Sequence, residues 1–184
     1  YSGRIVNNVI GNPAVDGSGS LEASGIDVEA HGTGGSHTTL VAGNSVYRYN
    51  NDGIYFLAGE GNPAFNITCV SNLVSTPNSG INPLHGMHFN IGTIAGETIQ
   101  ACINVQANTL TDAGAEANGG VDLRMRQRQS TTVRLPGYGG AAYDTAAVQT
   151  YLTGRNTLTT VLAGASVSGG GYLNTVGGAP CTPP

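Results

Sequence analysis

The 184-residue sequence carries very little charge. It has no lysine and no tryptophan, and charged residues make up only 10% of it. With a formal net charge of −4, the chain lacks the basic surface that general nucleic-acid binding requires. No apolar run approaches the ~18 residues of a membrane-spanning helix. The 29 glycines, with abundant Asn, Ser and Thr, are typical of one turn-rich β domain.

Cysteine is also scarce. Three cysteines are too few for a dense disulfide framework, and the absence of a Cys-x-x-Cys pair argues against a metal site. The sequence therefore predicts neither a metal nor another cofactor.

A six-residue motif, apolar-x-x-Asn-x-apolar, occurs four times. Its copies span Ile5–Ile10, Val41–Val46, Cys69–Val74 and Val105–Leu110. The successive asparagines lie 36, 28 and 36 residues apart. A second motif, Gly-apolar-x-apolar, alternates with the first. Its copies span Gly25–Val28, Gly53–Phe56, Gly86–Phe89 and Gly120–Leu123. A repeat of 20–50 residues indicates a solenoid or an array.

The residues within both motifs predict strands rather than helices. Apolar and polar residues alternate, as in a strand with one buried face. The connectors are rich in Gly, Asn, Ser and Pro, which favours turns. Short strands joined by turns predict a parallel β-helix whose coils stack about 4.8 Å apart. The equivalent asparagines would then form a hydrogen-bonded ladder at a corner, where Asn also tolerates a left-handed backbone. The ladder residues are Asn8, Asn44, Asn72 and Asn108.

These alternating coils resemble the right-handed parallel β-helices of the pectate-lyase-like kind, which are common in large secreted and surface proteins of bacteria. The resemblance covers about residues 1–136 and implies an all-β solenoid of about four to five coils. The segment 124–138 is also similar to the ends of very long bacterial β-repeat surface proteins. In the polysaccharide lyases and hydrolases that share this fold, the active groove usually lies over an outward strip of stacked strands.

Residues 137–184 are expected to form a capping helix and a tail rich in Gly, Thr, Ser and Pro. Asp144 and Thr145 would cap a short helix that Gly154 ends. Its apolar face would comprise Ala147, Val148, Tyr151 and Leu152. An amphipathic helix of this kind can cover the open end of a solenoid. Residues 156–184 predict a strand packed along the outside, with alternation from Val161 to Val167, or a flexible tail.

The strand pattern assigns each cysteine a direction. Cys69 replaces Val41 and Val105 of the repeat and should point inward. Cys102 alternates with inward residues and should point outward, and Cys181 lies in the tail. We expect a Cys102–Cys181 disulfide in an extracellular setting.

Four outward residues are candidates for catalysis. They are Asp27, Glu29, His88 and Asp122. Stacking would place His88 about 5 Å from Asp122, where a carboxylate could orient the imidazole as a general base. No two carboxylates, however, are placed to share one substrate bond. The sequence therefore favours a polar ladder without chemistry, and it leaves a carbohydrate-active lyase, hydrolase or tailspike-like depolymerase as the alternative.

Three arginines alternate on the last predicted coil: Arg124, Arg126 and Arg128. Arginine binds planar anions through two parallel hydrogen bonds, so these residues could bind anionic sugars. They could equally pair with Asp112, Glu116 or Asp122 and end the sheet with charge.

The sequence begins at Tyr1 with neither Met nor a signal peptide, which suggests a processed product or part of a longer protein. Its first strands would present a bare edge, where preceding coils or the tail strand of another copy could dock and build a filament. Asn66 begins a glycosylation sequon. We expect a structural or adhesive segment of a surface protein or filament, extracellular or on the cell surface. Its partners would be other copies or preceding coils, with an anionic surface glycan as a further possibility.

Overall fold

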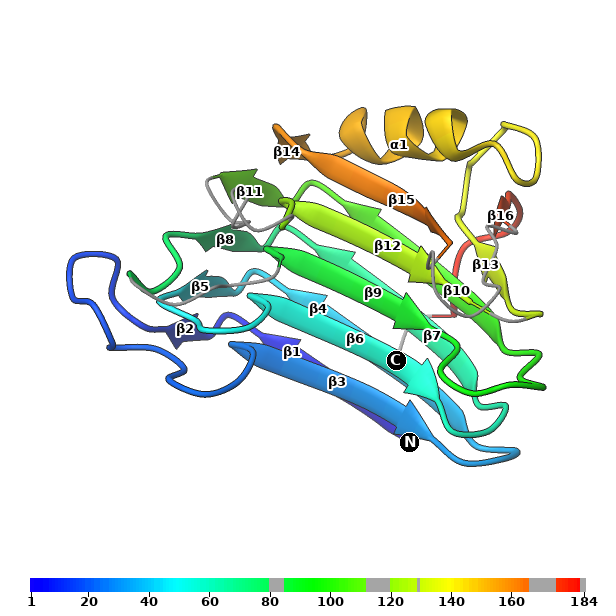
Figure 1. The fold of residues 1–184 in the computed structure, drawn as a ribbon, viewed down its shortest axis with the longest axis horizontal. Coiled ribbons are helices and arrows are strands. Elements are labelled where there is room, and N and C mark those ends of the chain that lie inside the picture. Colours follow the sequence, from blue (N-terminus) through cyan, green and yellow to red (C-terminus); the bar gives the residue numbers. More distant parts are fainter. Residues whose placement is uncertain (80–84, 112–119, 129, 166–174, 183–184) are drawn as a thin grey trace.

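The computed structural model describes all residues except 80–84, 112–119, 129, 166–174 and 183–184 (Figure 1). The described chain is mostly β, with three parallel sheets and a single short helix. This arrangement is consistent with an all-β parallel solenoid. None of the helical residues it describes forms a segment long and apolar enough to cross a membrane.

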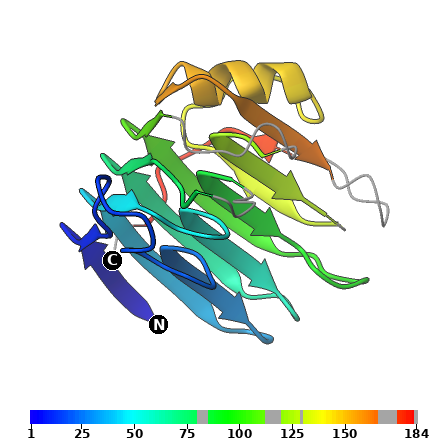
Figure 2. The same ribbon diagram turned by 60° about the vertical axis from the view of Figure 1, so that its left-hand side comes forward.

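Each sheet collects every third strand of the repeating part of the chain. The first sheet contains β1 (Ser2–Val6), β4 (Ser36–Ala42), β7 (Ala64–Val70), β10 (Gln100–Gln106), β13 (Thr132–Arg134) and β16 (Thr175–Val176). The second contains β2 (Val9–Ile10), β5 (Ser45–Tyr47), β8 (Leu73–Ser75), β11 (Thr109–Thr111) and β14 (Thr157–Leu158). The third contains β3 (Ile26–His31), β6 (Ile54–Gly59), β9 (Met87–Ile91), β12 (Leu123–Gln127) and β15 (Val161–Ala165). The chain visits the first, second and third sheets in that order; we call one such round a coil (Figures 1 and 2).

The interior is filled by the inward residues of all three sheets. In β3 and β6 the residues alternate between buried and more accessible positions, as the period of two predicts. Phe56 and Phe89 stack on adjacent coils with ring centroids 4.6 Å apart. The motif glycine Gly53 lies so close to the next coil that a Cβ atom would collide with Val74 and with the Gly86 carbonyl oxygen. A side chain at Gly53 would therefore not fit at this corner.

The asparagine ladder predicted from the first motif is present between the first and second sheets. The Asn8, Asn44 and Asn72 amides each donate to the Oδ1 atom of the next ladder residue at 2.9 Å. Asn108 donates in the same way to Asn156, again at 2.9 Å. The backbone N–H of each of these four donors bonds to the same Oδ1 atom.

Two features of the ladder differ from the expectation. The left-handed residue at these corners is the one before the ladder asparagine, as with Asn7 (φ 57°) and Ser71 (φ 56°). The ladder also has a fifth member, Asn156, which the motif does not identify. Thr153 occupies the apolar position of the motif there, and the inserted helix lengthens the spacing.

Helix α1 (Thr145–Thr153) forms where the sequence predicted it. The Asp144 side chain accepts the Ala147 N–H at 2.9 Å, and Gly154 follows the last turn. Val148 and Leu152 are buried, while Ala147 and Tyr151 pack against the core. The helix contacts β15 and lies over the end of the stack (Figure 1).

For residues 156–184 we expected a strand packed along the outside or a flexible tail, and the described strands there form neither. β14, β15 and β16 pair in parallel with β11, β12 and β13 and so extend the same three sheets. Val161–Ala165 thus pairs with β12 of its own chain and is the last strand of the third sheet. Val167 lies outside the described residues.

The cysteines have the predicted environments. Cys102 and Cys181 form a disulfide with Cα atoms 5.5 Å apart. Cys69 is a free, fully buried thiol, and burial raises its pKa above the ordinary range.

Candidate functional site

The candidate site lies on the outer face of the third sheet. Its strands place Asp27, Tyr55, His88 and Arg124 in one row across four coils. A second row, two residues along the strands, holds Glu29, Leu57, Asn90 and Arg126. We call these two rows together with Arg128 the outer strip.

The register corrects the expected catalytic pair. β12 pairs with β9 so that Leu123 lies beside Met87 and Arg124 beside His88. The motif at Gly120 is therefore out of register by two residues, and Asp122 takes the place of the motif glycine. The Asp122 carboxylate is buried and accepts hydrogen bonds from the Thr159 hydroxyl and the Thr160 N–H. Asp122 is thus not the outward partner of His88.

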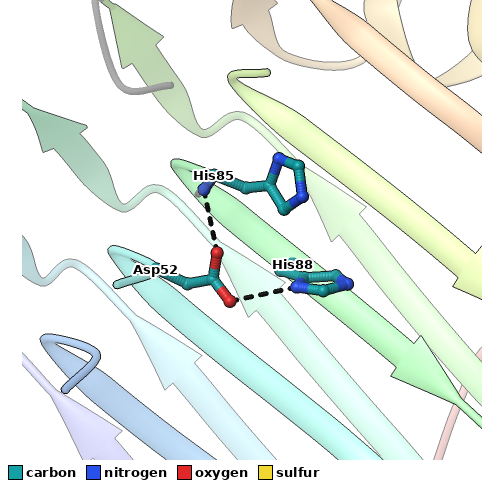
Figure 3. Close-up of side chains that lie close together, drawn as sticks. All are labelled: Asp52, His85 and His88. Atoms are coloured by element: carbon teal, nitrogen blue, oxygen red, sulfur yellow. Dashed lines mark hydrogen bonds and ion pairs between the residues drawn. The ribbon is translucent and has the colours of Figure 1, made fainter. Parts of the chain in front are cut away.

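The carboxylate beside His88 belongs to Asp52, in the corner before β6. Asp52 Oδ2 lies 3.0 Å from His88 Nδ1, and Asp52 Oδ1 accepts the His85 backbone N–H at 2.8 Å (Figure 3). Both residues are buried: 2% of the Asp52 side chain and 8% of the His88 side chain are exposed. The Asp52 carboxylate therefore orients the imidazole of His88, because one oxygen holds the ring and the other is fixed to the backbone.

A second imidazole completes this cluster. The His85 and His88 rings meet edge to face, with centroids 4.8 Å apart. His85 Nδ1 accepts the Val121 N–H at 3.1 Å from the next coil. Burial, followed by the charge of His88, lowers the pKa of His85 to about 4. His85 is consequently a neutral imidazole at pH 7.

Hydrogen bonds along the outer strip connect three coils. The Asn90 amide donates to the Tyr55 hydroxyl at 2.8 Å, and Arg128 donates to Asn90 Oδ1 at 2.9 Å. Tyr55 also packs edge-on against His88 at 5.2 Å. This network positions the Arg128 guanidinium before any ligand binds.

The three arginines lie together on one side of β12, as the alternation predicted. All three are partly buried. Burial and the charge of Arg126 lower the pKa of Arg124 and of Arg128. Both effects disfavour the positive charge, and an incoming anion would offset the repulsion between the guanidinium groups. The alternative partners Asp112 and Glu116 lie outside the described residues.

No family model, curated protein or solved structure matches this chain. The interpretation of the site therefore depends on its own geometry.

The remaining predicted candidates lie at the other end of the outer strip. Asp27 and Glu29 line a depression of about 320 Å³ together with Tyr1 and His37. Partial burial, followed by the negative charges of Glu29 and Asp52, raises the pKa of Asp27 to about 6. Glu29 Oε2 lies 2.8 Å from His31 Nε2. Asp27 and Glu29 thus form an acidic end that is separate from the arginines.

Sequence reasoning missed Asp52 and His85 because they precede the motif glycines and belong to neither motif. A usable signal was present, however. Gly53 donates its N–H to the His85 carbonyl oxygen and Gly25 donates to that of Asp52, so the residues before successive motif glycines stack on one another. Extending the repeat by one position would have placed Asp52 beside His85.

Proposed function

We propose that this chain is a right-handed parallel β-helix that serves as a structural or adhesive segment of an extracellular or cell-surface protein. Its outer strip would bind an anionic surface glycan. The observation that carries this proposal is a row of three partly buried arginines: Arg124 and Arg126 on β12, and Arg128 directly after it. The pKa values of Arg124 and Arg128 are lowered.

The chemistry of arginine supports an anionic ligand. A guanidinium presents a planar set of donors that matches a carboxylate or sulfate, and it is more weakly hydrated than an ammonium group. Outward residues of one strand lie about 6.7 Å apart, so Arg124, Arg126 and Arg128 form a straight row rather than a pocket. A row of this kind suits an extended polymer with repeated negative charges.

The geometry favours binding over the catalytic alternative. The imidazole of His88 has an orienting carboxylate in Asp52, but its Nε2 atom is buried. The acidic residues Asp27 and Glu29 lie at the opposite end of the outer strip. Asp27 and Glu29 share one depression, and neither His88 nor the three arginines line it.

Neutralising the arginines should weaken glycan binding. We expect the parent chain to bind immobilised heparin and hyaluronate but not neutral dextran, with affinity that falls as salt is added. The triple variant Arg124→Gln, Arg126→Gln, Arg128→Gln should weaken binding at least tenfold in surface plasmon resonance. Arg4→Gln, on the exposed part of β1, provides a matched control that removes one charge elsewhere.

Two results would overturn this proposal. One is a parent chain that binds neither polyanion at low salt. The other is a triple variant that keeps its circular dichroism spectrum and binds as tightly as the Arg4→Gln control.

A further inference from the structure

A buried cluster at the corner between the second and third sheets contains side chains of the types that bind metal ions. Asp52, His85 and His88 each offer one ligand atom, and these atoms all lie within 4.8 Å of one another (Figure 3). All three residues are buried, with 1%, 6% and 6% of their surfaces exposed. Three such groups facing each other away from water differ from the usual exposed and solvated histidines and acids.

One nitrogen of the cluster is unused. His88 Nδ1 faces Asp52 Oδ2 at 3.0 Å, which leaves Nε2 as the ring nitrogen that a metal ion could bind. Nε2 is buried and has no hydrogen-bond partner among the described residues. A buried polar atom without a partner is unfavourable in the free protein, and a bound ion would remove this cost.

We propose that His85 and His88 bind a divalent transition-metal ion of the Zn²⁺ class through one imidazole nitrogen each, with the Asp52 carboxylate supplying negative charge. A carboxylate that holds one ring nitrogen of a histidine while the other faces a metal is a recurrent arrangement in metal sites. Two imidazoles and a carboxylate suit Zn²⁺, Co²⁺, Ni²⁺ or Cu²⁺ better than Ca²⁺ or Mg²⁺, which prefer oxygen ligands.

Binding requires two local changes. Ligands of one tetrahedral zinc ion lie about 3.3 Å apart, given metal–ligand distances of roughly 2.0–2.1 Å. The two imidazole nitrogens must therefore move together, which requires rotation of the side chains. His85 must also give up its bond from the Val121 N–H, because the lone pair that accepts it is the only one the neutral ring has.

A second group of possible metal ligands lies on the surface, and metal bound by the protein could be held there instead. His31 lies 2.8 Å from Glu29 and 3.3 Å from Glu60, on the exposed part of the molecule. That site has one imidazole, whereas the buried cluster has two, so the two sites can be distinguished by the number of histidines on the metal.

The test titrates the full chain, stripped of metal with a chelator, with Co²⁺ and Zn²⁺ at pH 7. We expect one equivalent of Co²⁺ to bind with visible absorption bands, and X-ray absorption of the Zn²⁺-loaded parent to show two imidazoles. His88→Gln should weaken binding at least 100-fold, and Asp52→Asn by 10- to 100-fold. His31→Gln should bind like the parent.

Other outcomes would overturn the proposal. They are a parent that binds no Co²⁺ below about 1 mM, a zinc spectrum with one imidazole or none, and loss of binding in His31→Gln. The spectrum is taken on the unaltered chain, so the test holds even if a buried variant fails to fold. Glycan binding by the arginines is measured separately, and the two proposals can fail independently.

Discussion

Replacing Cys102 and Cys181 together with alanine should lower the free energy of unfolding by about 4 kcal/mol. The disulfide joins residues 79 positions apart, and closing a loop of this length lowers the conformational entropy of the unfolded chain. The bond ties residues after β16 back to β10 in the first sheet. Urea unfolding followed by circular dichroism measures the change.

The free thiol provides the control for this experiment. Cys69 is fully buried between coils whose equivalent residues are Val41 and Val105, so Cys69→Val should change the stability by less than about 1.5 kcal/mol. If the double alanine variant unfolds at the same urea concentration as the parent, the disulfide contributes nothing and the chain-entropy argument is wrong for this protein.

Asn72→Leu should destabilise the protein by roughly 2–4 kcal/mol. The Asn72 side chain accepts the Asn44 amide and donates to Asn108 Oδ1 and to the Val41 carbonyl oxygen, all in buried positions. Leucine satisfies none of these groups, and each buried group without a partner costs about 1–3 kcal/mol, partly offset by relaxation. Thermal and urea unfolding both report the loss.

Asn8→Leu is the matched control at the open end of the ladder. Asn8 is exposed and its amide donates only to Asn44 Oδ1 and to the Val6 carbonyl oxygen, both of which water can replace. We expect a cost below about 1 kcal/mol. Equal effects of the two substitutions would show that burial of the ladder does not stabilise the fold.

The sequence predicts three features whose residue types have a specific structural role: the asparagine ladder, the helix and the disulfide. The ladder could be predicted because asparagine between fixed apolar positions needs a partner of its own kind above and below. The helix could be predicted because Asp144 and Gly154 bracket an apolar face. Cys102 and Cys181 could be paired because Cys69 occupies an inward valine position.

The register of the last coil could not be predicted from the pattern. A strand has a period of two, so a slip of two residues keeps every side chain on its own face and leaves the alternation intact. Gly120 resembled the earlier motif glycines, but Asp122 takes their place because Leu123 pairs with Met87. Because of this slip, Asp122 was predicted to lie beside His88, whereas the structure places Asp52 beside His88.

Cysteine cross-linking across β9 and β12 tests the register that assembles the outer strip, on which the proposed function depends. In a Cys69→Val background, Asn90→Cys with Arg126→Cys should oxidise readily, because these residues are direct neighbours about 4.8 Å apart. Asn90→Cys with Arg124→Cys should not, because that diagonal spans about 8 Å between Cα atoms. Cross-linking of the second pair and not the first would place Asp122 beside His88 and contradict the account.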